Sequence, residues 1–132
     1  MKLVDKMKDE NLGLAILYNF TKGYGHVPMN VYDVVLPLLY HDDFRNHLFG
    51  GVKVEEALTK CVQEDVSFIQ TILDAIEEDK EMTSRALGIC LLNKYLSFEF
   101  EDNEMKGIYH ESSILDINEA INLGKFFSGK SY

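Results

Sequence analysis

The residues best suited to chemistry in this sequence are four histidines, two cysteines and a surplus of carboxylates. His41 and His47, with Asp42 and Asp43 between them, come nearest to a cluster of metal ligands. A zinc site needs three or four ligands that converge on one point, but a six-residue separation puts two histidines on different faces of a helix. We therefore predict no metal site and expect His41, Asp42 and Asp43 to cap helix ends.

No other pattern predicts catalysis. Cys61 and Cys90 are far apart, have no CxxC partner and do not neighbour a histidine, so they are predicted to be reduced, buried thiols. Gly23-Tyr24-Gly25 lacks the preceding strand that a dinucleotide site requires. The sequence predicts no catalytic residue, no cofactor and no enzymatic activity.

Aromatic and apolar side chains are concentrated between the first two predicted helices. Large aromatics and methionine are enriched at the buried centres of protein interfaces. The candidate interface residues are Tyr18, Tyr24, Val27, Met29, Tyr32 and Val35. The alternative, that these side chains fill the core of a small domain, remains open at this point.

Composition limits the function further. The 132 residues fit one domain, 1–132, and the 13 basic and 22 acidic residues give a net charge of −9. Arginine occurs only at Arg45 and Arg85, so direct DNA binding is disfavoured and contact with DNA is expected only through partners. The longest apolar stretch, 34–40, is too short to span a membrane and the charged start lacks a signal sequence, so we expect a cytoplasmic protein.

Helical periodicity accounts for most of the chain. Asp9 is the predicted N-cap of the first helix, Gly23 and Gly25 its end, and Pro37 interrupts or restarts the second. In the fifth helix, five apolar residues share one stripe: Val66, Ile69, Ile72, Leu73 and Ile76. A solvated turn is expected at 77–81, after that helix. The predicted helices span about 10–22, 31–40, 44–48, 54–62, 65–78, 83–95 and 115–127.

The period changes after residue 95. Leu96, Phe98 and Phe100 alternate with polar residues, and a polar turn at 102–104 leads to a second strand at 106–110, so we predict a β-hairpin. The fold class is mainly α, a compact helical domain with one β-hairpin in its C-terminal half.

The order of elements from 65 to 110 is also that of a winged helix. Its recognition helix, 82–95, would carry only two cations, Arg85 and Lys94, which favours a protein-binding version. A winged-helix transcriptional regulator or antitoxin, which would require operator binding, is the alternative.

Several short motifs resemble the middle components of three-component ABC systems. They are 12–24 (LGLAILYNFTKGY), 35–41 (VLPLLYH), 107–110 (GIYH) and 120–127 (AINLGKFF). The resemblance covers most of the chain. One departure is that the family often has Asn-Pro before Leu-Gly, where this chain has Asp9-Glu10-Asn11.

The resemblance implies a non-enzymatic adaptor subunit. In such bacterial systems, including those called Lamassu, the middle component sits between an SMC-like ABC ATPase and an effector, frequently a nuclease. The assembly acts in antiviral defence against phage and against plasmids. A weaker alternative is a small phage or plasmid protein that binds a host factor.

Overall fold

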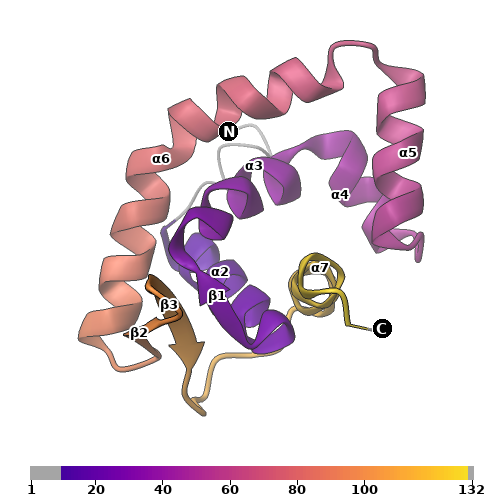
Figure 1. Cartoon of the computed structure of the whole chain (residues 1–132). Helices are drawn as coiled ribbons and strands as arrows, with labels where there is room; N and C mark the ends of the chain where they lie inside the picture. Colours follow the sequence, from indigo (N-terminus) through magenta and orange to yellow (C-terminus); the bar gives the residue numbers. More distant parts are fainter. Residues whose placement is uncertain (1–9, 131–132) are drawn as a thin grey trace.

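The structure is a computed structural model that describes residues 10–130, so the predicted cap Asp9 lies outside the described residues. It is mainly helical, with one small antiparallel sheet, which confirms the predicted fold class (Figure 1). In chain order the elements are α2 (Glu10–Tyr24), β1 (His26–Pro28), the 3-10 helix η1 (Met29–Val34), α3 (Val35–Tyr40), α4 (Asp42–Phe49), α5 (Val54–Glu64), α6 (Phe68–Leu92), β2 (Leu96–Glu101), β3 (Glu104–Tyr109) and α7 (Asn118–Ser128).

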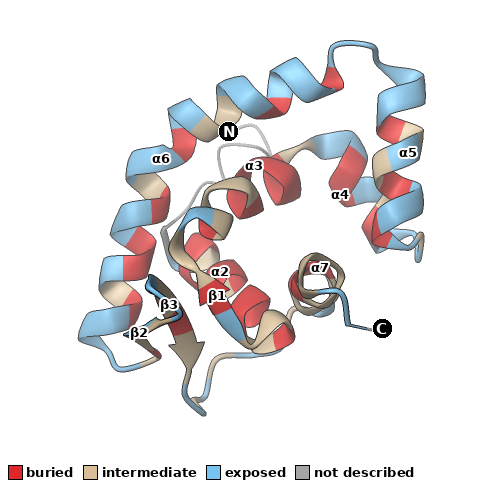
Figure 2. Ribbon diagram, in the orientation of Figure 1, coloured by how far each residue is buried: buried red, intermediate tan, exposed pale blue. Residues whose placement is uncertain are grey.

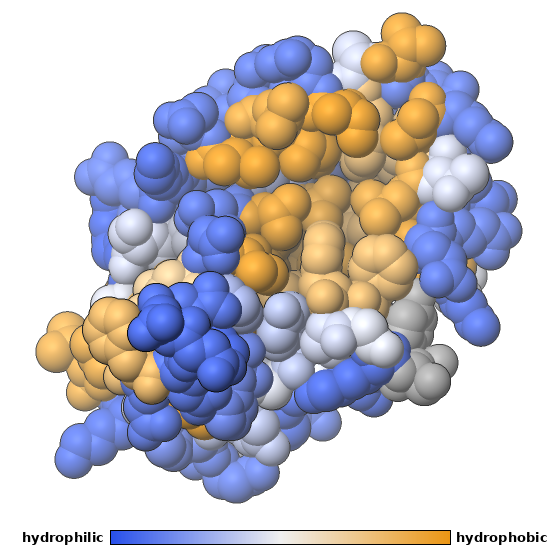
Figure 3. Space-filling model, in the orientation of Figure 1, coloured by the Kyte–Doolittle hydropathy of each residue, from blue (hydrophilic) through white to orange (hydrophobic). Residues whose placement is uncertain are grey.

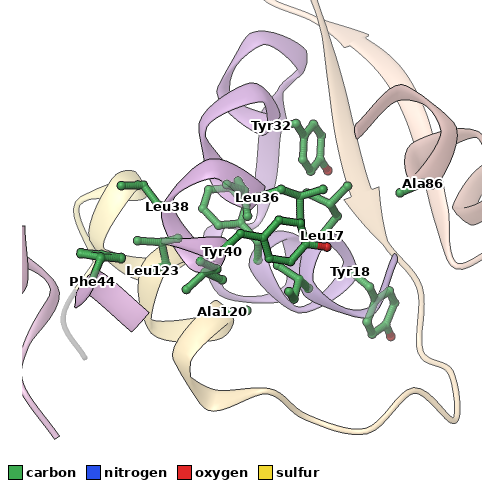
Figure 4. Close-up of a cluster of buried hydrophobic side chains, with 14 of the residues drawn as sticks. Leu17, Tyr18, Tyr32, Leu36, Leu38, Tyr40, Phe44, Ala86, Ala120 and Leu123 are labelled. Carbon is green, nitrogen blue, oxygen red and sulfur yellow. The ribbon is translucent and has the colours of Figure 1, made fainter. Parts of the chain in front are cut away.

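Helix α2 is the centre of the fold. It packs against α7, α6, α3 and β3, and its buried side chains include Leu17 and Phe20. Figure 2 shows buried residues concentrated on α2 and α3 and on the inner side of α6, and Figure 4 shows the side chains that meet there. A helix that is apolar on more than one side is buried in this way because each side needs a packing partner.

Helices α2 and α7 cross at two glycines. A Cβ on Gly23 would overlap the carbonyl oxygen of Ile121, and a Cβ on Gly124 would overlap the carbonyl oxygen of Phe20. Gly23 lies inside α2, so the prediction that it ends the helix is wrong. The helix ends before Gly25, whose φ of +107° is a conformation that favours glycine.

The predicted hairpin is confirmed, and it carries an additional strand. The register pairs Phe98 with Gly107, and Asp102 and Asn103 both have positive φ, as a two-residue hairpin turn requires. The segment 26–30 lies between two predicted helices and was not predicted to form a strand, but its first three residues form β1, which pairs antiparallel with β3. The sheet order is β1-β3-β2.

The predicted turn between the fifth and sixth helices is wrong. Residues 68–92 form one continuous helix, α6, of 25 residues, and the expected turn at 77–81 is part of it. Asp79 and Thr83 lie on its buried side, so packing continues through the acidic stretch. Because 65–110 contains no helix–turn–helix, the winged-helix reading of this segment is also wrong.

The positions and caps of the shorter helices agree with the predictions more closely than those of α6 do. Pro37 is the third residue of α3, where a missing N–H is tolerated, and η1 precedes it, so the proline marks a restart. His41 caps α4 by accepting a hydrogen bond from the backbone N–H of Phe44 at 3.3 Å, as predicted. Helix α5 and helix α7 each lie within a few residues of their predicted positions.

The glycine crossing gives a stability prediction. Gly124→Ala should lower the free energy of unfolding by about 1–3 kcal/mol, because the methyl group forces two backbones apart. Gly88→Ala is the matched control, since its Cβ meets nothing within 4 Å, and it should stabilise the protein by about 0.5–1 kcal/mol through helix propensity. Urea denaturation followed by circular dichroism measures both. Equal stability of Gly124→Ala and wild type would contradict the close crossing.

Candidate protein interface

Four of the six predicted interface residues lie in the core. Tyr18 is 1% exposed, and Val27, Tyr32 and Val35 are 0% exposed. Side chains buried to this extent cannot contact a partner while the domain is folded, so for these four the core alternative is correct. Tyr24 and Met29 are partly buried and pack against the core, so part of each remains accessible. Their role at an interface stays a prediction.

Tyr18 joins α2 to the hairpin. Its hydroxyl donates a hydrogen bond to the carbonyl oxygen of His110 at 2.5 Å, across 92 positions of the chain. The rings of Tyr95 and Tyr109 meet its ring edge-on, at centroid distances of 6.3 and 6.1 Å. Such edge-to-face contacts are favourable beyond the area they bury. Tyr18 thus holds the end of β3 against α2.

Tyr32 has a similar role between η1 and α2. Its hydroxyl lies 2.6 Å from Oγ1 of Thr21, which in turn donates to the carbonyl oxygen of Leu17 at 2.8 Å. Gly107 leaves room for the ring, because a Cβ there would overlap the tyrosine hydroxyl. Burial raises the pKa of Tyr32. Tyr32 therefore ties η1 to both α2 and β3 (Figure 4).

The accessible apolar surface lies elsewhere. One group of exposed apolar side chains lies at the corner between α5 and α6, and we call it the corner patch: Val62, Val66, Ile69 and Leu73, which are 45%, 99%, 56% and 51% exposed. Figure 3 shows a broad group of apolar side chains on the face of the molecule that Figure 1 views. Solvent-exposed apolar clusters of this kind mark binding surfaces.

A second apolar surface lies at the opposite end of α6. Leu91 and Leu92 are 49% and 82% exposed, and we call them the C-terminal patch. Beside them is a groove of about 450 Å³ lined by Leu91, Lys94, Leu96, Ser97 and His110. The two surfaces sit at the two ends of one rigid helix (Figure 1).

The sequence predicted the apolar stripe that contains most of the corner patch, but it did not predict which side of the helix is buried. Val66, Ile69, Ile72, Leu73 and Ile76 share a stripe, yet only Ile72 of these five is buried, at 7% exposure. Phe68, outside the stripe, is the true anchor, because its ring packs edge-on against His41 at 4.9 Å. At the other end, Leu91 follows Leu87 at helical spacing, yet Leu87 is buried and Leu91 is half exposed.

The histidines and cysteines have separate structural roles. His41 caps α4, whereas Nε2 of His47 lies 3.4 Å from Oε1 of Glu64 on α5. Within residues 10–130, no three His, Cys, Asp or Glu side chains gather in a way that could hold a metal ion. Cys61 and Cys90 are free and buried, and burial raises the pKa of their thiols to about 11 and about 12.

Two ion pairs fix elements near the core. Nζ of Lys22 lies 3.0 Å from Oδ1 of Asp116, which joins α2 to the segment before α7 and raises the pKa of Lys22. The buried Arg45 reaches Oδ1 of Asp42 at 2.7 Å. In the part of the chain that the structure describes, none of the helices is both long and apolar enough to cross a bilayer.

The fold and its surface define a small, mainly helical protein with exposed apolar patches at both ends of its longest helix. The family model of the ABC-three component (ABC-3C) system Middle Component 3 matches residues 12–132. The chain belongs to this family, which makes it the middle component of a three-component system. No curated protein and no solved structure matches the chain.

The burial of Tyr32 gives a second prediction. Tyr32→Ala should lower the free energy of unfolding by about 3–5 kcal/mol, since it leaves a cavity between η1, α2 and β3. Tyr32→Phe, which keeps the ring, should cost only about 1 kcal/mol. The loss of unfolding free energy for Tyr24→Ala should lie between the losses for these two variants. The Tyr24 ring, 5.8 Å from that of Phe20, is only partly buried. Thermal denaturation compares the three. A Tyr32→Ala variant with wild-type stability would show that this ring is not in the core.

Proposed function

We propose that this chain is a non-enzymatic adaptor subunit that docks an effector to an SMC-like ABC ATPase. The effector is proposed to be a nuclease, and the complex to act in the bacterial cytoplasm against phage and plasmids. Membership of the Middle Component 3 family supports the general part of this proposal, because a middle component works with the other components of its system.

The observation that carries the proposal is the position of the two apolar patches. Leu73 in the corner patch and Leu91 in the C-terminal patch are separated by about 27 Å along α6, at 1.5 Å per residue. An adaptor has to hold two partners without steric conflict between them. A continuous helix with a polar middle and an accessible apolar cluster near each end suits that task.

The chemistry of the chain is consistent with a binding role. The thiols are buried and their raised pKa values keep them protonated at neutral pH, so they are poor nucleophiles. His41 and His47 are each committed to a helix cap or an ion pair. Catalysis in the assembled system is therefore assigned to the partners.

The charge of the chain supports an indirect relation to DNA. With a net charge of −9, the chain offers few cations to phosphates, and Arg45 is buried. An acidic adaptor leaves DNA contact to its partners and is itself suited to bind basic surfaces.

Co-expression of the tagged full-length chain with the other two components of its system tests the proposal. We expect all three to co-purify, with a mass by native mass spectrometry that includes each of them. Combined Leu91→Ser and Leu92→Ser should lower the recovery of one component about tenfold or more and retain the other, because interface energy is concentrated in a few side chains.

The matched control is Leu115→Ser, which changes an apolar side chain that is 85% exposed but outside both patches. This control should assemble like wild type. Purification of the chain as a free monomer from cells that contain both other components would contradict the adaptor function.

A further inference from the structure

Strand β2 has one edge with which none of the described residues pairs. The sheet order is β1-β3-β2, so β2 is hydrogen-bonded to β3 on one side only. Outside the sheet, its main contact is with the end of α6 that leads into it. An unpaired edge presents a row of backbone N–H and C=O groups, which is the pattern that another strand recognises.

The hydrogen-bond pattern identifies the residues that face this edge. The backbone N–H of His110 donates to the carbonyl oxygen of Tyr95 at 2.9 Å, just before β2 begins. In an antiparallel ladder, every second pair of opposite residues exchanges bonds in this way. The residues between the bonded pairs direct their backbone groups away from β3, and in β2 these are Leu96, Phe98 and Phe100.

The side chains along the edge differ between the two faces of the sheet, because successive residues of a strand point to opposite faces. One face is apolar: Leu96 is buried, Phe98 is partly buried and Phe100 is 73% exposed. The other face carries the polar side chains of Ser97, Glu99 and Glu101. Any strand that pairs with this edge therefore meets an apolar row on one face and an acidic row on the other.

A second copy of the same edge complements this pattern in one register. An antiparallel pair centred on Phe98 places Phe98 opposite itself and Phe100 opposite Leu96 of the second copy. On the polar face, the same register places Glu99 opposite Ser97 of the second copy. Aromatic and aliphatic cross-strand pairs are favourable, so the apolar row becomes continuous and no two carboxylates are directly opposite.

The neighbouring registers fit less well. A pair centred on Glu99 would place its two carboxylates opposite each other, and a pair centred on Phe100 would place Glu99 opposite Glu101. Like charges directly opposite destabilise a strand pair. A pair centred on Ser97 would leave only three residues of each strand, 96–98, opposite one another. The register centred on Phe98 gives the longest pairing without a repulsive contact.

The two ends of the edge are also complementary to each other. Leu96 lines the groove beside the C-terminal patch, and the register brings the exposed ring of Phe100 from the second copy next to it. Lys94 lines the same groove, and the register brings Asp102 of the second copy to its neighbourhood. The Asp102 side chain is 89% exposed, although its Oδ2 lies 3.5 Å from Nζ of Lys106. Symmetry forms each of these contacts twice.

We propose that two copies of this chain form a symmetric dimer through the edges of β2, paired antiparallel and centred on Phe98. A twofold interface uses the same surface on both subunits, and this edge is complementary to itself. The inference does not rest on the proposed adaptor function. The corner patch lies at the end of α6 opposite to β2, so the dimer presents two copies of it (Figure 1).

Sedimentation velocity of the isolated full-length chain, over a series of concentrations, tests the proposal. Wild type should show a monomer–dimer equilibrium. Phe100→Ser should raise the dissociation constant of the dimer about tenfold or more, because it removes an aromatic ring from both halves of the interface. Its monomer should keep the wild-type melting temperature, since the ring is exposed.

Substitutions of Ser97 test the register. Ser97→Lys places a lysine opposite Glu99 of the second copy and should lower the dissociation constant about fivefold, since two pairs of opposite charge form. Ser97→Glu places two carboxylates opposite each other, twice, and should raise it by a similar factor. The matched controls are Ser84→Lys and Ser84→Glu, which make the same charge changes at an exposed residue of α6 and should alter dimerisation much less.

Three results would overturn the proposal. One is a wild-type chain that stays monomeric throughout the concentration series. Another is a dimer that Phe100→Ser leaves unchanged, which would pair through a different surface. The last is a dimer that responds in the same direction to both substitutions of Ser97, and this comparison decides the question even if Phe100→Ser folds poorly. All three concern the isolated chain, so the adaptor function is tested separately by co-purification.

Discussion

The close contact between α2 and α7 is the constraint on which the rest of the fold depends. Two helices separated by 94 or more positions in the sequence approach backbone to backbone because Gly23 and Gly124 have no side chain at the crossing. This places α2 in the middle of the molecule, where it also contacts α6, α3 and β3. A hydrogen bond from Tyr18 then fastens the end of β3 to α2, and a hydrogen bond between Tyr32 and Thr21 fastens η1 to α2.

This central packing explains why the external surface of α6 is available. The other helices and the sheet complete the core together with one side of α6. The opposite side of that long helix therefore has no structural task within the domain. The apolar side chains that remain there, in the corner and C-terminal patches, are costly to expose, and the proposed function accounts for them as contacts with partners. The arrangement is that of a rigid spacer attached to a small core (Figure 1).

Local sequence patterns predicted the features that depend on neighbouring residues. Alternation of Leu96, Phe98 and Phe100 identified the hairpin, and the position of His41 before Asp42 and Asp43 identified the cap of α4. The strand β1 was missed because three residues pair with a strand about 80 positions away, and nothing local distinguishes them from a connector.

Two errors have one physical cause, which is that burial is decided by distant parts of the chain. The acidic stretch from Glu77 to Asp79 looked like a turn, but it contains no glycine or proline, and Asp79 and Thr83 continue the buried side of α6. The aromatic residues around Tyr18 and Tyr32 looked like surplus apolar surface, but the hairpin and Gly107 accommodate them in the core. The accessible apolar side chains are instead in the helical stripe near Val66, whose exposed side only the fold reveals.

Hydrogen–deuterium exchange of the chain, alone and in the complete three-component complex, tests the central claim that α6 bridges two partners. The account predicts slower exchange on assembly in two separate segments, about 62–77 and 91–97, with little change in α2, which is already protected by burial. Protection confined to one end of α6, or to surfaces away from α6, would contradict it.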